Sequence, residues 1–287
     1  MGARQPQRLT RWLCRDRSVE FRVTPLIMGI LNLTPDSFSD GGRFNAPDAA
    51  IARALQMQRD GADIIDIGGE STRPGANPVP AHLECERILP VIEALSAESD
   101  VLISVDTTKA DVAGRALAAG AHIVNDVSAT TGDADMTALV VESGAGVVLM
   151  HMQGTPGSMQ DKPKYDDVVN DVRRYLLERA EILVAAGVVA EQIVVDPGIG
   201  FGKTLEHNLS LLNGLTRLSQ ATYPLLVGLS RKRWIGELTG REAQDRLAGS
   251  LVGAMVCAQR GAKIVRVHDV AETRDAFSVV EALSKGV

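Results

Sequence analysis

Eight short apolar runs in this 287-residue chain each end at or near a polar side chain that could do chemistry. Carboxylates, carboxamides and imidazoles can accept or donate hydrogen bonds, hold a cation or exchange a proton. Five such residues form the first candidate set: Asn32, Asp106, Asn125, Asp196 and His268. An Asp or Asn after a strand can also begin a turn or cap a helix, so any single one could be structural. Five together are harder to explain by capping and predict a polar site.

The runs themselves are typical of strands that are buried on both faces, and the segments between them carry helical periodicity. They cover residues 26–31, 64–65, 101–105, 123–124, 147–150, 193–195, 225–228 and 264–267. Eight strand–helix units predict an α/β fold, a single (β/α)8 TIM barrel, whose active site lies at the carboxyl ends of the strands. We expect residues 1–24 to be an N-terminal extension and residues 25–287 to be the barrel domain.

Composition excludes several classes of protein. A net charge of −6 and 3% aromatic residues give no reason to expect a nucleic-acid partner. Three cysteines without metal-ligand spacing argue against disulfides and zinc. No run approaches the ~18 apolar residues of a membrane span. The arginine-rich N-terminus lacks the apolar segment of a secretory signal, so we expect a cytoplasmic protein, with a transit peptide as the alternative.

Basic residues gather at the same strand ends, although the chain as a whole is acidic. They are Arg73, Lys203, the triplet 231–233 and Arg266. Loops after the last two strands of such a barrel often bind phosphate, which favours a small anionic substrate. For Lys203 and for Arg233 of the triplet, a solvated helix end is the alternative.

Three connecting segments are unusual. Residues 32–42 and 68–79 are long for connections in a barrel and are typical of binding loops or lids, with ordinary flexible surface as the alternative. The glycines of 198–202 fit neither a Walker A loop, because Pro197 stands where glycine is required, nor a dinucleotide fingerprint, because residue 203 is lysine. They predict instead a pocket loop that lets the backbone approach a flat ligand.

Eight strings carry a resemblance to the dihydropteroate synthases of folate biosynthesis. They are GILNLTPDSFSDGG (29–42), DIGGESTRPGA (66–76), SVDTTK (104–109), NDVS (125–128), LMHMQGTP (149–156), DPGIGFGK (196–203), VGLSRKRWIG (227–236) and RVHD (266–269). The resemblance implies a transferase that condenses 6-hydroxymethyl-7,8-dihydropterin pyrophosphate with p-aminobenzoate, using Mg²⁺, to give dihydropteroate and pyrophosphate. It also implies a dissociative, SN1-like route and competition by sulfonamides.

The candidate residues fit these ligands. The edge of a pterin ring offers paired donors and acceptors that buried carboxylates and amides can match. We expect the pterin to be bound by Asp106, Asn125 and Asp196 at its edge, by Lys232, and by Met150 and Phe201 over its faces.

The resemblance implies the other contacts. Pyrophosphate would be bound by Thr72, Arg266 and His268, with Mg²⁺ shared by its oxygens and Asn32. The p-aminobenzoate pocket would be formed by Phe38, Thr72, Arg73, Pro74, Phe201 and Ser230. Asp40 and Lys232 are the candidate catalytic residues, and Asp40 would stabilise a cation.

Residues 243–260 predict an apolar helix in which Gly249 and Gly253 permit close helix approach. Together with the resemblance, this favours a homodimer, although packing on the barrel is an alternative use of the same helix. Two other functions remain open. A pterin-binding methyltransferase would not need Ser71–Pro74 or Ser230–Lys232, and a paralogue that binds pterin without coupling it should show damaged loops, which this chain does not.

Overall fold

The computed structural model describes residues 9–34, 46–71, 75, 77–155 and 157–285. Eight parallel strands form its central sheet: β3 (Leu26–Asn32), β4 (Ile64–Gly68), β5 (Leu102–Asp106), β6 (Ile123–Asp126), β7 (Gly146–Met150), β8 (Ile193–Asp196), β9 (Leu226–Gly228) and β10 (Ile264–Val267). Their order is β8-β7-β6-β5-β4-β3-β10-β9, and a parallel bridge between Val195 and Leu225 closes the sheet. The predicted TIM barrel is therefore confirmed.

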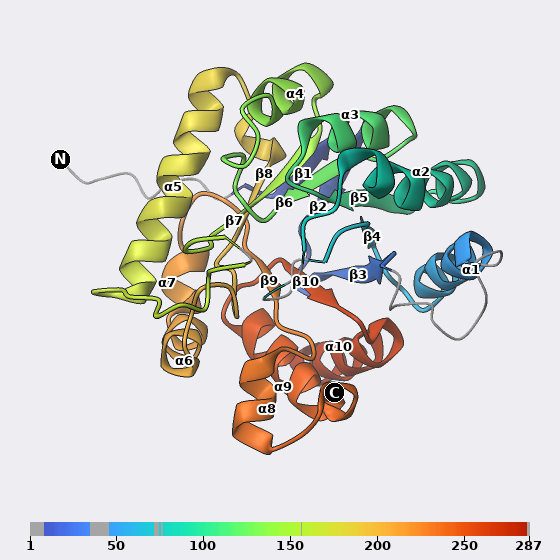
Figure 1. Cartoon of the computed structure of the whole chain (residues 1–287). Helices are drawn as coiled ribbons and strands as arrows, with labels where there is room; N and C mark the ends of the chain where they lie inside the picture. The colour runs from blue at the N-terminus through green and yellow to red at the C-terminus, as the bar shows by residue number, and fades with distance from the viewer. Residues whose placement is uncertain (1–8, 35–45, 72–74, 76, 156, 286–287) are drawn as a thin grey trace.

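Helices form a ring around this sheet (Figure 1). They are α1 (Ala46–Arg59), α2 (Ala81–Glu98), α3 (Ala110–Ala118), α4 (Met136–Ser143), α5 (Val168–Ala186), α6 (Leu205–Asn213), α7 (Leu215–Ser219), α8 (Arg233–Thr239), α9 (Leu247–Gln259) and α10 (Val270–Lys285). Local sequence fixes their ends. The Asp167 side chain accepts from the N–H groups of Val169 and Asn170 at the start of α5, and Gly187 ends that helix with φ +115°.

The segment before the barrel closes its amino end. Strands β1 (Arg11–Cys14) and β2 (Arg17–Glu20) form an antiparallel hairpin, which lies behind the sheet in Figure 1. Trp12 is fully buried and donates from Nε1 to the Gln192 carbonyl at 2.8 Å. It packs with the first residues of several strands, Leu26, Ile64, Leu102, Ile123, Leu226 and Ile264. Part of the expected N-terminal extension thus belongs to the core of the barrel.

The apolar segment 243–260 is not one continuous helix. A 3-10 turn, η3 (Ala243–Asp245), precedes α9, which begins at Leu247. The two glycines of α9 lie against the chain's own side chains: a Cβ at Gly249 would overlap Ile235, and one at Gly253 would lie 2.8 Å from Leu229. Their close approach therefore serves packing within the chain.

All three cysteines, Cys14, Cys85 and Cys257, are buried and free. Among the described residues, no helix is both long and apolar enough to cross a membrane.

Candidate active site

Polar residues from neighbouring strands lie in one row at the carboxyl end of the barrel. Asn32 on β3 pairs in register with Gly68 on β4, Gly68 pairs with Asp106 on β5, and Asp106 pairs with Asn125 on β6. Carboxyl ends of parallel strands meet at one face, so the separate strand ends of the sequence become a single surface. The structure brings these three predicted residues together.

Arg266, on β10, is far from these residues in the sequence but contacts them in the structure. Its Nε donates to Asp66 Oδ2 at 2.6 Å and its Nη2 donates to Asp106 Oδ2 at 2.7 Å. Asn125 Nδ2 donates to the same Asp66 oxygen at 2.9 Å. Asp66 is fully buried, and Asp106 and Asn125 are nearly so. The guanidinium therefore holds two buried carboxylates at fixed positions, with more geometric definition than a lysine could give.

Two carboxylate oxygens in this cluster lack partners. Asp66 Oδ1 and Asp106 Oδ1 are buried, and neither has a hydrogen-bond partner within the described part of the chain. A buried acceptor left unpaired costs about 1–3 kcal/mol. The arrangement is thus suited to a ligand that brings its own N–H donors, as a pterin edge does.

Burial and neighbouring charges shift the pKa values of Asp106 and Arg266 in opposite directions. Burial raises the pKa of Asp106 to about 7, although the Arg266 guanidinium opposes it. For Arg266, burial lowers the pKa, but Asp66 and Asp106 outweigh it and leave the pKa above its ordinary value. Arg266 consequently stays charged while Asp106 can exchange a proton near neutral pH.

Asp196, Phe201 and Lys232 form the second half of the site. Asp196 ends β8 in register with Met150 on β7, and its Oδ1 accepts from the Gly198 N–H at 2.7 Å. Lys232 donates to the Ile199 carbonyl, and its Nζ lies 4.5 Å from the centroid of the Phe201 ring. This is a cation–π contact that fixes the two side chains relative to each other.

Asp196 is buried, whereas Phe201 and Lys232 are half-buried, and this burial shifts the pKa values of Asp196 and Lys232. Burial raises the pKa of Asp196, and Lys232 opposes the shift. Burial lowers the pKa of Lys232 to about 8, and Asp196 opposes that shift in turn. A carboxylate accepts from a donor on a ligand and an ammonium ion donates to an acceptor, so the two groups together can recognise a ligand that carries both.

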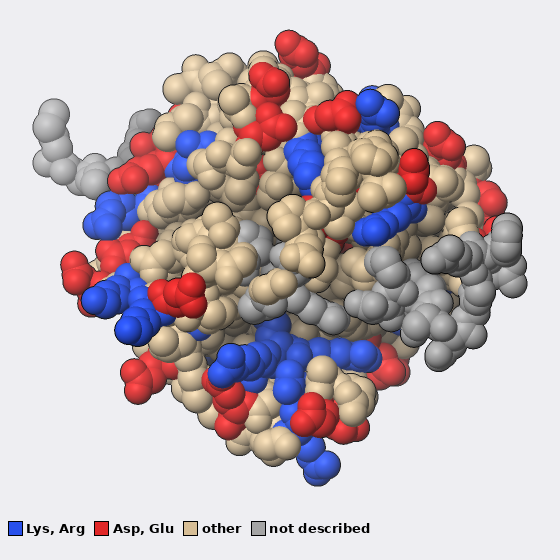
Figure 2. Space-filling view, viewed as in Figure 1, with Lys and Arg blue, Asp and Glu red and all other residues tan. Residues whose placement is uncertain are grey.

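The end of the site near β10 carries His268 and Ser230. The Ser230 hydroxyl lies 3.1 Å from His268 Nδ1 and accepts from the His268 N–H at 3.3 Å. Arg231 pairs with Asp269 beside them. Figure 2 shows that Lys and Arg side chains gather on this face over the region of β9, β10 and α8. The predicted basic surface at the carboxyl end is therefore present.

Two basic residues differ from this prediction. Lys203 is neither on the rim nor at a solvated helix end, because only 3% of it is exposed. Arg233, by contrast, is 84% exposed in its side chain and pairs with Glu237 four residues later on α8. The solvated alternative holds for Arg233 and is wrong for Lys203.

Five predicted site residues lie outside the described part of the chain: Phe38, Asp40, Thr72, Arg73 and Pro74. The structure therefore leaves their roles as predictions.

Several residues that support the site were not among the predicted ones. Asp66 is the first, although a carboxylate between Ile65 and Ile67 in an apolar strand signals a buried charge that needs a partner. Lys109 is the second case: it pairs with Glu70 and, at 2.6 Å, with the fully buried Glu84.

Comparison with known proteins agrees with the geometry. A family model described as "Pterin binding enzyme" matches residues 28–268. The dihydropteroate synthase of Escherichia coli (strain K12) is 49% identical over 258 residues, which cover 90% of this chain and 91% of the relative.

Solved structures give the same result. The Xanthomonas albilineans dihydropteroate synthase with 4-aminobenzoic acid superposes with a TM-score of 0.91 at 47% identity, covering 97% of this chain and 99% of the other. The structure of that organism's enzyme in complex with 7,8-dihydropteroate has a TM-score of 0.87 at 44% identity, with 96% and 99% covered. The fold and the polar strand ends thus define a TIM-barrel enzyme of the pterin-binding class. The chain belongs, within that class, to the dihydropteroate synthase family, whose members are transferases.

Proposed function

We propose that this protein condenses 6-hydroxymethyl-7,8-dihydropterin pyrophosphate with p-aminobenzoate, giving 7,8-dihydropteroate and pyrophosphate. The single observation that carries the proposal is the buried, unpartnered carboxylate oxygen of Asp106, which Arg266 holds beside Asp66 in an otherwise bonded cluster. The related enzyme of Xanthomonas albilineans binds 7,8-dihydropteroate and 4-aminobenzoic acid, which are the product and one substrate of this reaction.

The pterin is recognised at its edge and at its faces. Asp106 and Asp196 accept from ring N–H and amino groups, Asn125 supplies an amide, and Lys232 donates to the ring's acceptors. Phe201 covers one face, and Met150, which pairs in register with Asp196, lies at the other. A ligand without a matching edge leaves these buried groups unpaired, at about 1–3 kcal/mol each, so selectivity is steep.

Pyrophosphate binds toward β10, with His268, Arg266 and Thr72 as its protein contacts. Arg266 uses Nε and Nη2 for Asp66 and Asp106, and a guanidinium has five N–H donors, so others remain for phosphate oxygens. Ser230 orients His268 through their hydrogen bond.

Mg²⁺ is the proposed cofactor, with Asn32 as its protein ligand. In the residues that the structure describes, no three His, Cys, Asp or Glu side chains form a metal site. The donor set nevertheless fits Mg²⁺, which commonly combines one protein oxygen with phosphates and waters. A Cβ at Gly68 would lie 3.7 Å from Asn32 Oδ1, so the glycine keeps the space beside that oxygen open. Bound there with pyrophosphate, Mg²⁺ would neutralise charge on the leaving group.

The reaction follows a dissociative route. The bond between the pterin methylene carbon and the pyrophosphate oxygen breaks first, and its electron pair leaves with pyrophosphate. The carboxylates of Asp106 and Asp196 then face the ring of the resulting cation, with Asp40 as a further anionic group. The amino nitrogen of p-aminobenzoate attacks the carbon and loses a proton, and no covalent enzyme intermediate forms.

The p-aminobenzoate pocket forms beside the Phe201 ring. Ser230 is 4% exposed at the end of this pocket and precedes α8. Phe38, Thr72, Arg73 and Pro74 complete the pocket in this proposal.

We infer that the protein is a homodimer through α6, α8 and α9. A groove of about 320 Å³ lies between these helices, with Leu209, Trp234 and Val256 among its apolar lining. Leu238 and Val252 on the same groove are 54% and 64% exposed. Such a continuous exposed apolar patch is typical of an interface.

Introducing a charged side chain into this groove tests whether it forms the dimer interface. Val252→Glu should shift the mass measured by sedimentation from dimer to monomer. Val279→Glu is the matched control, because Val279 is 60% exposed on α10 and does not line the groove. A monomeric wild-type protein would contradict the inference.

Release of pyrophosphate by the purified protein tests the reaction. With dihydropterin pyrophosphate and Mg²⁺, release should depend on p-aminobenzoate, equal the dihydropteroate formed and fall when a sulfonamide is added. Pterin binding without product would identify a non-coupling paralogue. Methyl transfer from a reduced folate without pyrophosphate release would identify a methyltransferase.

A further inference from the structure

A buried lysine that the proposed reaction does not use lies behind the pterin site. Lys203 follows Phe201 and Gly202 in the loop between β8 and α6. An ammonium ion has three N–H donors, and Lys203 has three acceptors in reach. These are the Phe201 carbonyl at 2.8 Å, the His151 carbonyl at 3.2 Å and His151 Nδ1 at 3.0 Å. The hydrogen-bonding capacity of the ammonium ion is thus fully used.

All three acceptors are uncharged. Burial lowers the pKa of His151 to about 3, so its imidazole is neutral. A protonated Lys203 beside Nδ1 requires the tautomer in which Nδ1 accepts and Nε2 carries the proton. Burying an ammonium ion against neutral partners is costly. A methionine could fill the same volume without that cost. The lysine must therefore contribute something other than packing.

The contribution lies in what the three bonds connect. His151 follows β7, whereas Phe201 belongs to the loop after β8, so Lys203 joins two loops of the site face. The same two loops also approach each other closely at two glycines. A Cβ at Gly198 would overlap the His151 carbonyl, and one at Gly202 would lie 2.7 Å from the Gln153 carbonyl oxygen. Only glycines allow this approach.

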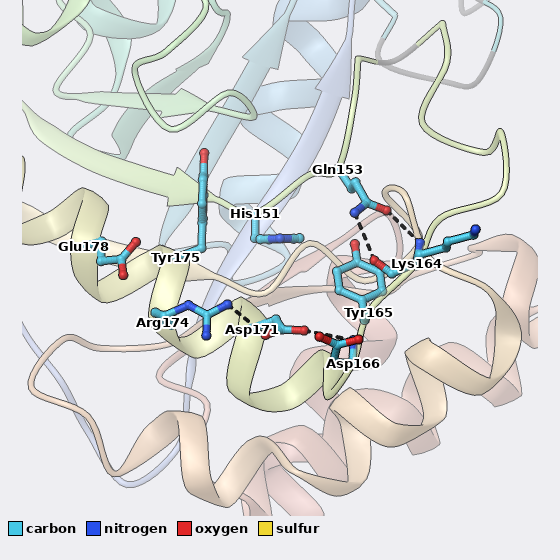
Figure 3. A pocket seen from close by; sticks show the side chains of 9 residues that line it. All are labelled: His151, Gln153, Lys164, Tyr165, Asp166, Asp171, Arg174, Tyr175 and Glu178. Carbon is cyan, nitrogen blue, oxygen red and sulfur yellow. Dashed lines mark hydrogen bonds and ion pairs between the residues drawn. The ribbon is translucent and has the colours of Figure 1, made fainter.

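The outer side of this junction is visible in a pocket of about 420 Å³ (Figure 3). His151 lies there between two tyrosine rings, whose centroids are 5.9 Å away for Tyr165 and 5.0 Å away for Tyr175. Tyr165 also donates from Oη to the Gly202 carbonyl at 2.7 Å. The imidazole that accepts from Lys203 is therefore held in place by its own surroundings.

We propose that Lys203 is a positioning residue for pterin binding. Its ammonium ion fastens the β8–α6 loop to the β7–α5 loop and so fixes the Phe201 ring against Lys232 and the Asp196 carboxylate toward the ligand. This inference rests on the proposed function, since it names a residue that prepares the same pterin site. Lys203 touches no reacting atom, and acts through the Phe201 peptide group.

The protonation state of Lys203 makes the pH dependence of pterin binding a second test of the proposal. The charged groups that act on Lys203 are Asp196 at the end of β8 and Lys232 before α8, and the neutral His151 faces it from β7. Burial lowers the pKa of Lys203 to about 7. Deprotonation of Lys203 leaves two N–H donors for three acceptors, so one of its hydrogen bonds is lost as the pH rises through this value.

The test compares Lys203→Met with Lys164→Met in the full chain. Lys164 is exposed and lies on the neighbouring loop, where its backbone alone bonds Gln153. For Lys203→Met we expect KM for dihydropterin pyrophosphate to rise about ten-fold, the loss of one to two hydrogen bonds, with kcat within about three-fold. Lys164→Met should match the wild type.

The pH profile and a second variant keep the test decisive. Between pH 6 and 9, the affinity of the wild type for the pterin, measured by calorimetry, should fall more steeply near pH 7 than that of Lys203→Met, because Asp106, whose pKa is also about 7, titrates in both proteins. If Lys203→Met does not fold, Tyr165→Phe can be used instead. It removes one hydrogen bond to the β8–α6 loop, the one to the Gly202 carbonyl, and should raise KM about three-fold.

Each outcome decides the matter. Unchanged KM in Lys203→Met, or in Tyr165→Phe where only that variant folds, overturns the positioning role while the proposed function stands. A wild-type protein that does not bind the pterin overturns both. A raised KM with a wild-type pH profile shows a structural role for the side chain and also overturns the proposal.

Discussion

The two ends of the barrel are built from the same eight strands but differ in almost every physical property. At the amino end, first residues such as Leu26 and Ile64 pack around the fully buried Trp12, whose only polar side-chain atom, Nε1, is hydrogen-bonded. At the carboxyl end, Asp66 and Asp106 keep buried oxygens without partners in the described structure. One end is complete as folded, and the other is complete only with a ligand.

This difference shows where stability and function are separated in the molecule. Unsatisfied and shifted groups lower stability, and proteins keep them where binding or catalysis requires them. Changes at the amino end should therefore affect unfolding and leave substrate binding alone, and changes at the carboxyl end should do the reverse. Variants at each end of the barrel test this separation.

Trp12→Ala should cause the largest loss of stability. Removing a large aromatic side chain from a closed core costs about 3–5 kcal/mol in the free energy of unfolding. Urea denaturation measures this loss, and calorimetry at low temperature should still give the wild-type Kd for the pterin. A large change in that Kd for a folded variant would show that the two ends are coupled.

Asp196→Ala should give the opposite result. Loss of a charged hydrogen-bonding group costs about 1.5–3 kcal/mol of binding, so the pterin Kd should rise at least ten-fold. Burial raises the pKa of Asp196, so its charged form lowers the stability of the folded state, and its removal should not decrease the free energy of unfolding at neutral pH. Calorimetry with the substrate checks the affinity. Asp196→Ala with full affinity would remove Asp196 from the pterin site.

The barrel could be predicted from the sequence because its strands are apolar runs with clear ends, and the row from Asn32 to Asn125 followed from that fold. The hairpin could not be predicted, because Arg11–Cys14 is only four residues long and the residues that bury its Trp12 lie at the starts of strands far along the chain. Asp66 was missed because its significance depends on Arg266, which is 200 residues away in the chain. Whether a basic residue is exposed depends likewise on tertiary contacts, which is why Lys203 and Arg233 were not distinguished.

Gly146→Ala tests the amino end more gently. A Cβ there would lie 2.8 Å from Cys14 Sγ and 3.0 Å from Trp12 Nε1, so the hairpin must shift. Overpacking of this kind costs about 1–3 kcal/mol. Thermal unfolding should detect the loss, and KM for both substrates should stay at the wild-type value. Gly114→Ala is the control, since the nearest atom to its Cβ is 3.6 Å away.

The smallest expected effect on stability is a pH-dependent difference between the wild type and Lys203→Met. A lysine in the unfolded chain keeps its proton up to about 10.4, whereas burial lowers the pKa of folded Lys203 to about 7. Between these values the unfolded state binds more protons, so this residue makes the free energy of unfolding rise with pH, by at most about 1.4 kcal/mol per pH unit. Below pH 7 the slope vanishes because both states are protonated. The pKa of Lys232, which is about 8, acts in the same direction but is present in both proteins and cancels in the comparison.

Urea denaturation at pH 6, 7, 8 and 9 should therefore show the wild type gaining stability relative to Lys203→Met above pH 7. Parallel curves would mean that Lys203 titrates alike in both states, and that the charge behind the pterin site is not buried as the structure has it.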